Sequence, residues 1–505
     1  MENVIKKNAK PVLVVWFLSI ACYLPLIARG LTNSIDGLWA STYAQAGDWE
    51  LSIGRWAWLF LDKARGGYGA EPFNSLLTLL LIVIASFVAM SMFMDTDYKI
   101  YVFSMLALCS TTVCCYLSYR YMSPTFGMSV LLATVGARLL VMESEDKKKS
   151  IILLLASVAV IVVSLGLYQA NLGCFCVLVL LAMIKKTYDG ESKKCGAIFV
   201  KALIVGAVSC ILYKIAWDLC MWARKVQPAD YNGASSLSVV KMIVALPRSL
   251  RDIFVAWVRY FGPKAGNYLF SPLRVLIFVV IFALVIFVGV KQLRKSVKNL
   301  VVYIVLCLLI PVGANIAFVL APDASNALIQ MTFPMAFTVP LLLSFLTSVE
   351  FKAEKVLVVC AALLLYGNIY AVGTDIDAMA QGSTSTYAIV NNIVTELNRQ
   401  ELLSGEREYA FFGNFEKNEL FKKNVLFDKA DNFAQFGRMN KKPDMVHKSC
   451  IGLVDDIGLN LKIINNDRYI AIYKSGVLDS MPAFPAEGSI AEYDGVVIVK
   501  VSEDY

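Results

Sequence analysis

Long apolar runs dominate this sequence, and each is long enough to cross a membrane. A spanning helix needs about 20 mostly apolar residues. With 58% hydrophobic and 17% charged residues, the chain has too few charges for a soluble globule of its 505 residues. We therefore predict a polytopic α-helical membrane protein with eleven spans. They lie at about residues 11–29, 73–93, 100–118, 122–142, 150–167, 168–184, 196–217, 273–290, 300–320, 328–347 and 356–373.

Basic residues in the short connections predict the orientation of these spans. The amino terminus and residues 143–149, 185–194, 291–299 and 350–355 carry most of them, and an alternating path places all five on one side. By the positive-inside rule that side is the cytoplasm. The net charge of +8 is then explained by location and does not indicate nucleic-acid binding. The first run lacks a convincing cleavage site and is interpreted as a permanent span.

The first outward connection, residues 31–73, is rich in carboxylates and aromatic rings, although a helical hairpin needs only a few residues. A carboxylate can take a proton from an acceptor hydroxyl, and flat rings can cover a sugar. The alternative is that the rings only anchor the loop at headgroup depth. The candidates are Asp36, Asp48 and Glu50 as catalytic acids or bases, Trp39 and Trp49 as sugar contacts, and Arg55 as a phosphate contact.

Three short outward turns add further candidates. Arg120 lies between two tyrosines and is either a phosphate contact or a snorkelling side chain. Amides and acids in the other turns either bind sugar hydroxyls or cap helix ends. The substrate-binding candidates from these turns are Tyr119, Tyr168, Gln169, Asp323 and Asn326.

The long connection at 218–270 contains an amphipathic segment, KMIVALPRSLRDIFVAWVRYFG, with a possible kink at Pro247. At about 100° per residue its basic side chains fall on one stripe. That stripe indicates either adhesion to anionic lipid headgroups or a grip on the phosphate of a lipid-linked donor. The donor-phosphate candidates here are Arg248, Arg251 and Arg259.

After residue 373 the sequence no longer contains long apolar runs. A polar entry leads into a separate predicted helix, followed by alternating segments at 408–415, 424–430, 468–474 and 495–502. We predict a transmembrane domain at 1–373 and an extracytoplasmic soluble α/β domain at 374–505. The single histidine, His447, stands among lysines as in a solvated loop, so any general base is expected to be a carboxylate.

Four short elements resemble the Gtr-type membrane glucosyltransferases, which modify bacterial O-antigen and related cell-wall polysaccharides. They are SIDGLWA at 34–40, WELSIGR at 49–55, LYQA at 167–170 and the terminal MPAFPAEGSIAEYDGVVIVKVS at 481–502. The resemblance implies a GT-C-like fold in the bacterial cytoplasmic membrane and inverting transfer from a polyprenyl-phosphate sugar on its outer face. Family members often carry paired acids in the first loop, whereas Gly37 follows Asp36 here.

The sequence therefore predicts a glycosyltransferase in which Asp36 is the general base and arginines stabilise the leaving phosphate. The expected partners are the lipid-linked donor, a cell-envelope polysaccharide acceptor and membrane lipids, with a donor-synthesising glycosyltransferase and a small flippase as further candidates. No cofactor is required, although Asp36 and Asp48 could hold a divalent cation. The alternatives are a polymerase or ligase that uses lipid diphosphates, a transporter or flippase, and a membrane-anchored receptor.

Overall fold

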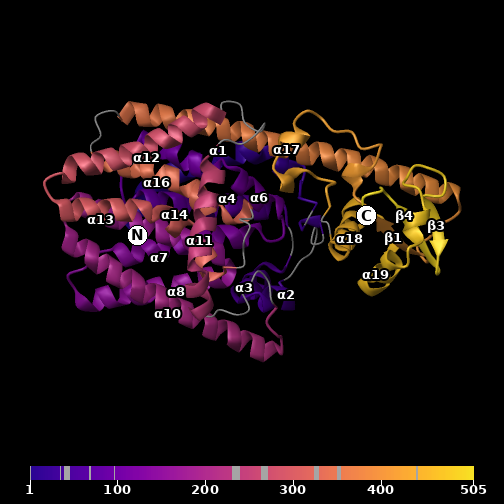
Figure 1. Ribbon diagram of the computed structural model, residues 1–505, viewed down its shortest axis with the longest axis horizontal. Helices are drawn as coiled ribbons and strands as arrows, with labels where there is room; N and C mark the ends of the chain where they lie inside the picture. The colour runs from indigo at the N-terminus through magenta and orange to yellow at the C-terminus, as the bar shows by residue number, and fades with distance from the viewer. Residues whose placement is uncertain are drawn as a thin grey trace.

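The computed structural model describes residues 2–34, 36–38, 46–67, 70–95, 97–229, 239–262, 271–322, 329–349, 354–439 and 442–505. Most of them form a bundle of long helices. A smaller part that contains a β-sheet lies at one end of this bundle, at the right of Figure 1.

Within these ranges, ten helical segments are long and apolar enough to cross a membrane, and a bent pair raises the number to eleven. All eleven coincide with predicted spans, which confirms the polytopic helical architecture. The ten are formed by α1 (Glu2–Ala28), α4 (Phe73–Met90), α7 (Ser123–Val141), α8 (Lys147–Leu167), α9 (Leu172–Tyr188), α10 (Ser192–Arg224), α12 (Ser271–Leu293), α13 with α14 (Val297–Leu308 and Ile310–Ala314), α16 (Phe333–Ser348) and α17 (Glu354–Arg399).

The third predicted span is a broken one, not a straight helix. Helices α5 (Tyr98–Leu108) and α6 (Thr111–Ser118) meet at an angle of 56°. The break frees backbone groups that lipid cannot satisfy. The Tyr23 hydroxyl on α1 donates to the carbonyl of Leu108 at 2.8 Å, and the Ser110 hydroxyl accepts from the Val113 N–H at 3.3 Å. Helix α6 is thereby held at a fixed angle, and its last turn reaches the candidate site.

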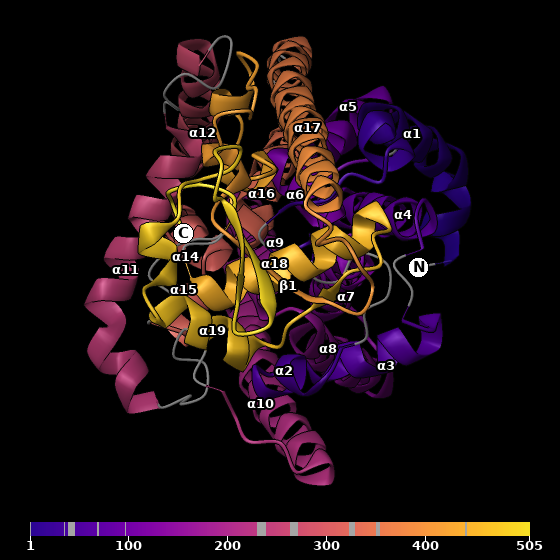
Figure 2. The same ribbon diagram turned by 90° about the vertical axis from the view of Figure 1, so that its right-hand side faces the viewer.

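Three short helices and the longer α11 (Val239–Phe261) complete the bundle. The short ones are α2 (Asp48–Ser52), α3 (Trp56–Arg65) and α15 (Ala317–Leu320), with 3-10 turns η2 (Gln169–Asn171) and η3 (Ile329–Met331). Helix α11 lies across the long helices (Figures 1 and 2). It buries Ile253 and Ala256 against Phe318 and leaves Val244 and its basic residues exposed. The predicted amphipathic helix is confirmed, and it continues through Pro247.

The carboxy-terminal part contains a four-stranded sheet of order β2-β1-β4-β3 among the described residues. Strand β1 pairs in parallel with β2 and β4, while β3 and β4 form an antiparallel hairpin. The elements are β1 (Glu408–Phe412), η4 (Phe415–Lys417), η5 (Phe427–Lys429), η6 (Asn432–Ala434), α18 (Pro443–Ile457), β2 (Lys462–Ile463), α19 (Asn466–Lys474), η7 (Val477–Ser480), β3 (Ile490–Tyr493) and β4 (Val496–Lys500).

Two of the predicted strand segments contain β1 and β4, but the prediction for residues 468–474 is wrong. These residues lie in α19, because Asn465 caps a helix there by accepting from the Arg468 N–H at 2.9 Å. Tyr469 and Ile472 are buried three residues apart, which is helical spacing.

The strand predicted at 424–430 is also absent from the structure. The Asn424 side chain accepts from the N–H groups of Leu426 and Phe427, both at 3.0 Å, and so forms a turn. The Val425 side chain between them is 81% exposed, so it adds nothing to a buried strand face. The alternation of apolar residues in this segment therefore belongs to a turn and the short η5 helix.

The prediction for His447 is wrong as well. It lies on α18, where its imidazole is buried and stacks on the Tyr469 ring with 4.3 Å between centroids. The apolar stripe of α18 explains this position, because Val446, Cys450 and Leu453 are buried on the same helix. The lysines around it in the sequence do not report the environment of the imidazole itself.

Helix α17 differs from its prediction in length. The predicted span ends at 373 and a second helix follows, whereas the structure has one helix of 46 residues. Its far half packs on the sheet-containing part: Gln381 Nε2 donates to the Lys422 carbonyl at 2.7 Å, and Gly382 lies against the backbone of Phe436. This helix therefore joins the bundle to the carboxy-terminal part without a linker.

Candidate functional site

The start of the first loop is fixed on the end of α6. Thr32 Oγ1 donates to the Ser118 carbonyl at 2.7 Å, and the Asn33 amide donates to Ser118 Oγ at 3.1 Å. Asn33 Oδ1 in turn accepts from the N–H groups of Asp36 and Gly37 at 3.0 and 2.9 Å. These contacts hold the Asp36 backbone in a turn above α6.

Asp36 is half-buried at this turn, and Tyr119 donates to its Oδ2 at 3.4 Å. The Tyr119 hydroxyl also accepts a short hydrogen bond from Gln330 Nε2. Burial raises the pKa of the Asp36 carboxyl, while the Tyr119 hydrogen bond and the charges of Arg55 and Lys448 act in the opposite direction. A carboxylate with a raised pKa is better suited to accept a proton near neutral pH.

Aromatic rings and one guanidinium form the rest of the site. The Arg55 guanidinium lies 5.1 Å from the centroid of the Tyr168 ring. Tyr168 packs edge-on against Phe126 at 4.8 Å, and Phe126 stacks on Tyr116 at 4.3 Å. These three rings are buried, so they form a packed wall that supports the Arg55 guanidinium.

Arg55 is positioned by the turn that precedes α3. Gln169 Nε2 donates to the Ile53 carbonyl and to the Tyr213 hydroxyl, both at 3.0 Å, and Tyr213 donates to the Gly54 carbonyl at 3.1 Å. Gln169, predicted to bind sugar, thus has a positioning role in this structure. The turn connects η2 and α10 to the residue that carries the cation.

Replacing Gly54 by alanine should disturb this turn. Gly54 has φ +87°, and an added Cβ would meet the Tyr213 hydroxyl and the Gln169 amide. A side chain in that conformation is strained by about 1–3 kcal/mol. We expect Gly54→Ala to lower transfer activity more than it lowers the yield of folded protein. Activity per folded molecule measures this, with Gly190→Ala as control, because that glycine also has positive φ but meets nothing within 4 Å. Equal activity of both variants would contradict the positioning role.

The carboxy-terminal part covers the site. Ser34 Oγ donates to the Arg438 carbonyl at 2.8 Å. Arg120 donates to the Gly30 carbonyl and to Asp456 Oδ1, each at 2.8 Å, and Asp456 Oδ2 accepts from the Tyr387 hydroxyl at 2.5 Å. Arg120, predicted to contact phosphate or substrate, therefore fastens the loop to α18 and α17.

The other acids of the first loop have different partners. Asp48 forms an ion pair with Arg224 at 3.0 Å, and its side chain is 64% exposed. Glu50 accepts from the Gly47 N–H at 2.7 Å and so caps the N-terminal end of α2. These contacts account for both carboxylates without a catalytic role. The exposed ring of Trp49 lies on the same short helix.

The remaining candidates lie elsewhere. Arg248, Arg251 and Arg259 are on the exposed side of α11, where Arg251 pairs with Asp252 at 2.8 Å. Trp39, Asp323 and Asn326 lie outside the described residues.

A metal held by Asp36 and Asp48 finds no support in this arrangement. Among the described residues, no three His, Cys, Asp or Glu side chains gather closely enough to hold a metal ion. Asp48 instead pairs with Arg224.

One protein-family model matches residues 34–347, which is more than half of the chain, and its description is Glucosyl transferase GtrII. The chain belongs to the GtrII glucosyl transferase family. It is therefore a glycosyltransferase, and the predicted resemblance is confirmed. No curated protein and no solved structure matches the chain.

The GtrII region contains Asp36, Arg55, Tyr119 and Tyr168, so the core of the candidate site lies within the family match. Helix α17 and the carboxy-terminal part lie beyond it. Lys448, whose charge acts on Asp36, comes from that part. Nothing in the sequence links residue 448 to residue 36, because only the fold brings them together.

Proposed function

We propose that this GtrII family member transfers glucose from a polyprenyl-phosphate carrier to a cell-envelope polysaccharide, with inversion, on the outer face of the bacterial cytoplasmic membrane. The observation that carries the proposal is the half-buried Asp36 carboxylate beside Arg55 and the Tyr119 hydroxyl. The proposed GT-C-like architecture and the extracytoplasmic place of the carboxy-terminal part belong to the same proposal.

In the proposed reaction, Asp36 accepts the proton of an acceptor hydroxyl. The oxygen attacks the anomeric carbon from the face opposite the lipid phosphate, the new glycosidic bond forms, and the bond to the phosphate oxygen breaks. The negative charge passes to the lipid phosphate, where positive side chains stabilise it. Arg55 lowers the pKa of Asp36 and so keeps the base ionised.

The proposed orientation is supported by charges at the end of the bundle away from the site. There, Lys186 and Lys194 both pair with Glu143, at 2.9 and 3.2 Å. The connections at 143–149 and 185–194 therefore lie together, as an alternating path requires. Their excess of lysine favours the cytoplasm for this end.

The pH dependence of transfer tests the role of Arg55. Asp36 must be ionised to act as a base, so activity should fall as the pH drops through its raised pKa, above the range of an ordinary aspartate. Arg55→Gln removes a charge that lowers the pKa of Asp36. We therefore expect the acid limb of the pH–activity profile, where activity falls, to move to higher pH. Arg55→Lys should leave the limb near its original position. A limb that stays fixed in Arg55→Gln would show that Arg55 does not act on the base.

The donor is tested by radiolabelled transfer in membranes that contain the full chain. Glucose is supplied on polyprenyl phosphate, as a nucleotide sugar, or within a lipid diphosphate oligosaccharide. We expect label to reach endogenous polysaccharide from the first donor only, in membranes stripped of soluble enzymes. Incorporation from the diphosphate donor alone would favour a polymerase or ligase and overturn the proposal.

A further inference from the structure

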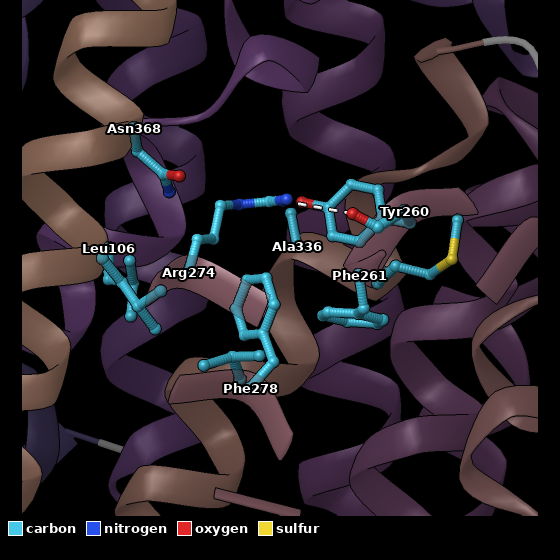
Figure 3. Close-up of a pocket in the computed structure, with 10 residues that line it drawn as sticks. Leu106, Tyr260, Phe261, Arg274, Phe278, Ala336 and Asn368 are labelled. Atoms are coloured by element: carbon cyan, nitrogen blue, oxygen red, sulfur yellow. Dashed lines mark hydrogen bonds between the residues drawn. The ribbon is translucent and has the colours of Figure 1, made fainter. Parts of the chain in front are cut away.

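A second polar feature lies away from Asp36, in a small pocket between five helices of the bundle. Figure 3 shows Arg274 crossing this pocket, with Asn368 on one side and Tyr260 on the other. Leu106, Phe278 and Ala336 complete much of the wall. The lining comes from α5, α11, α12, α16 and α17, so the pocket is built by the packed bundle and not by one loop.

Arg274 is an unusual residue for its position. It lies in the first turn of α12, a helix otherwise apolar enough to cross a membrane. An arginine at the end of a spanning helix commonly extends to the membrane interface, but the Arg274 side chain lines a pocket among the helices instead (Figure 3). Its guanidinium donates to the Tyr260 carbonyl at 3.1 Å and lies 4.7 Å from the centroid of the Phe278 ring. These contacts orient the planar donor group, and the N-terminal end of α12 adds positive potential.

The surroundings suit a ligand with a long apolar chain. Leu276 on α12, Ile369 on α17 and Val258 on α11 are exposed, and each lies within a few residues of the pocket lining. In a bilayer these side chains would face lipid tails. A ligand bound at Arg274 could therefore keep its polar group among the helices while its chain stays in the membrane.

Helix α16 connects this pocket to the Asp36 site. Gln330, in the turn before α16, donates to the Tyr119 hydroxyl beside Asp36. Ala336, six residues further along the chain and in the first turn of α16, lines the Arg274 pocket. One short segment, from Gln330 to Ala336, therefore contacts both the Asp36 site and the Arg274 pocket.

We propose that the Arg274 pocket binds the phosphate of the lipid-linked sugar donor, with Arg274 and Asn368 as hydrogen-bond donors and the polyprenyl chain leaving into the bilayer. This inference rests on the proposed function, since it assumes a lipid-linked donor. It assigns the phosphate to a residue inside the bundle, whereas the arginines of α11 are exposed and Arg120 pairs with Asp456. An arginine suits a phosphate because its planar guanidinium can donate two parallel hydrogen bonds to two phosphate oxygens.

Binding is tested with a photoactivatable polyprenyl phosphate and the full chain in nanodiscs. We expect crosslinks to peptides of α12, α16 or α17 and competition by unlabelled polyprenyl phosphate. The neutral polyprenol, inorganic phosphate and phosphatidylglycerol should compete at least tenfold less well. Arg274→Gln should reduce labelling about tenfold or more, and Arg274→Lys should reduce it less. Arg294→Gln is the matched control, because Arg294 is an exposed arginine just past the other end of α12.

A second variant tests the pocket independently, in case Arg274→Gln does not fold. Ala336→Leu fills the pocket from another helix, leaves the charge in place, and should also reduce labelling. Labelling that is unchanged in Arg274→Gln and Ala336→Leu would overturn the pocket assignment even if glucose transfer occurs. Labelling that depends on Arg274 in a protein without transfer activity would support the pocket and contradict the proposed reaction. Asp36→Asn should keep its labelling, which separates binding from chemistry.

Discussion

Asp36→Asn should reduce glucose transfer about 10²–10⁴-fold, the usual contribution of a general base. The amide keeps the shape of the side chain and can still accept from Tyr119, but it cannot take a proton from the acceptor. The loss should appear in kcat, with little change in the binding of lipid-linked donor. Radiolabel transfer at saturating donor, normalised to folded protein, measures it.

Two matched variants make this result specific. Asp189→Asn changes an exposed carboxylate that pairs with Lys185 in another part of the bundle, and activity should stay within about twofold. Asp48→Asn changes an acid of the same loop that pairs with Arg224 at the surface. If Asp48→Asn were to lose as much activity as Asp36→Asn, the assignment of a single base would be wrong.

Arg120→Met should destabilise the protein by about 3 kcal/mol, the lower end of the range for breaking a buried ion pair. The side chains of Arg120 and Asp456 are only 12% and 15% exposed. Removal of the guanidinium leaves the Asp456 carboxylate with the Tyr387 hydroxyl as its remaining hydrogen-bond donor in the contacts described above. We expect a lower midpoint of thermal unfolding in detergent and faster proteolysis of the carboxy-terminal part.

An exposed pair in the carboxy-terminal part provides the comparison. Arg407 and Glu492 pair at 2.8 Å with side chains 38% and 51% exposed. Arg407→Met should therefore cost less than about 1 kcal/mol. A double variant of Arg120 and Asp456 should cost less than the sum of the single changes, because both remove the same pair. Additive losses would show that the two side chains do not act together.

The positions of the spans could be predicted because a spanning helix is recognised by length and apolarity alone. The break between α5 and α6 could not, since it depends on Tyr23 from another helix. The strand predicted at 468–474 failed for a related reason. Its apolar residues fit both periods, and the cap at Asn465 decides for the helix.

For the site, the first loop could be predicted from its density of acids and rings, and Asp36 with Arg55 lies at its centre. The roles of Glu50, Gln169 and Arg120 could not be predicted. Their contacts depend on the folded structure, which composition does not reveal. Glu50 caps α2, Gln169 holds the turn before α3, and Arg120 pairs with Asp456 of α18. Arg274 is not distinguished by the sequence, because one arginine at a helix start resembles an interfacial anchor until the neighbouring helices are in place.

Helix α17 has a mechanical consequence. At 46 residues it is a continuous rod of about 69 Å, with one half in the bundle and the other packed against the carboxy-terminal part. A rod has no joint, so a tilt of its first half becomes a larger sideways displacement of its far end. The tilt of this one helix of the bundle therefore sets where the carboxy-terminal part lies relative to Asp36.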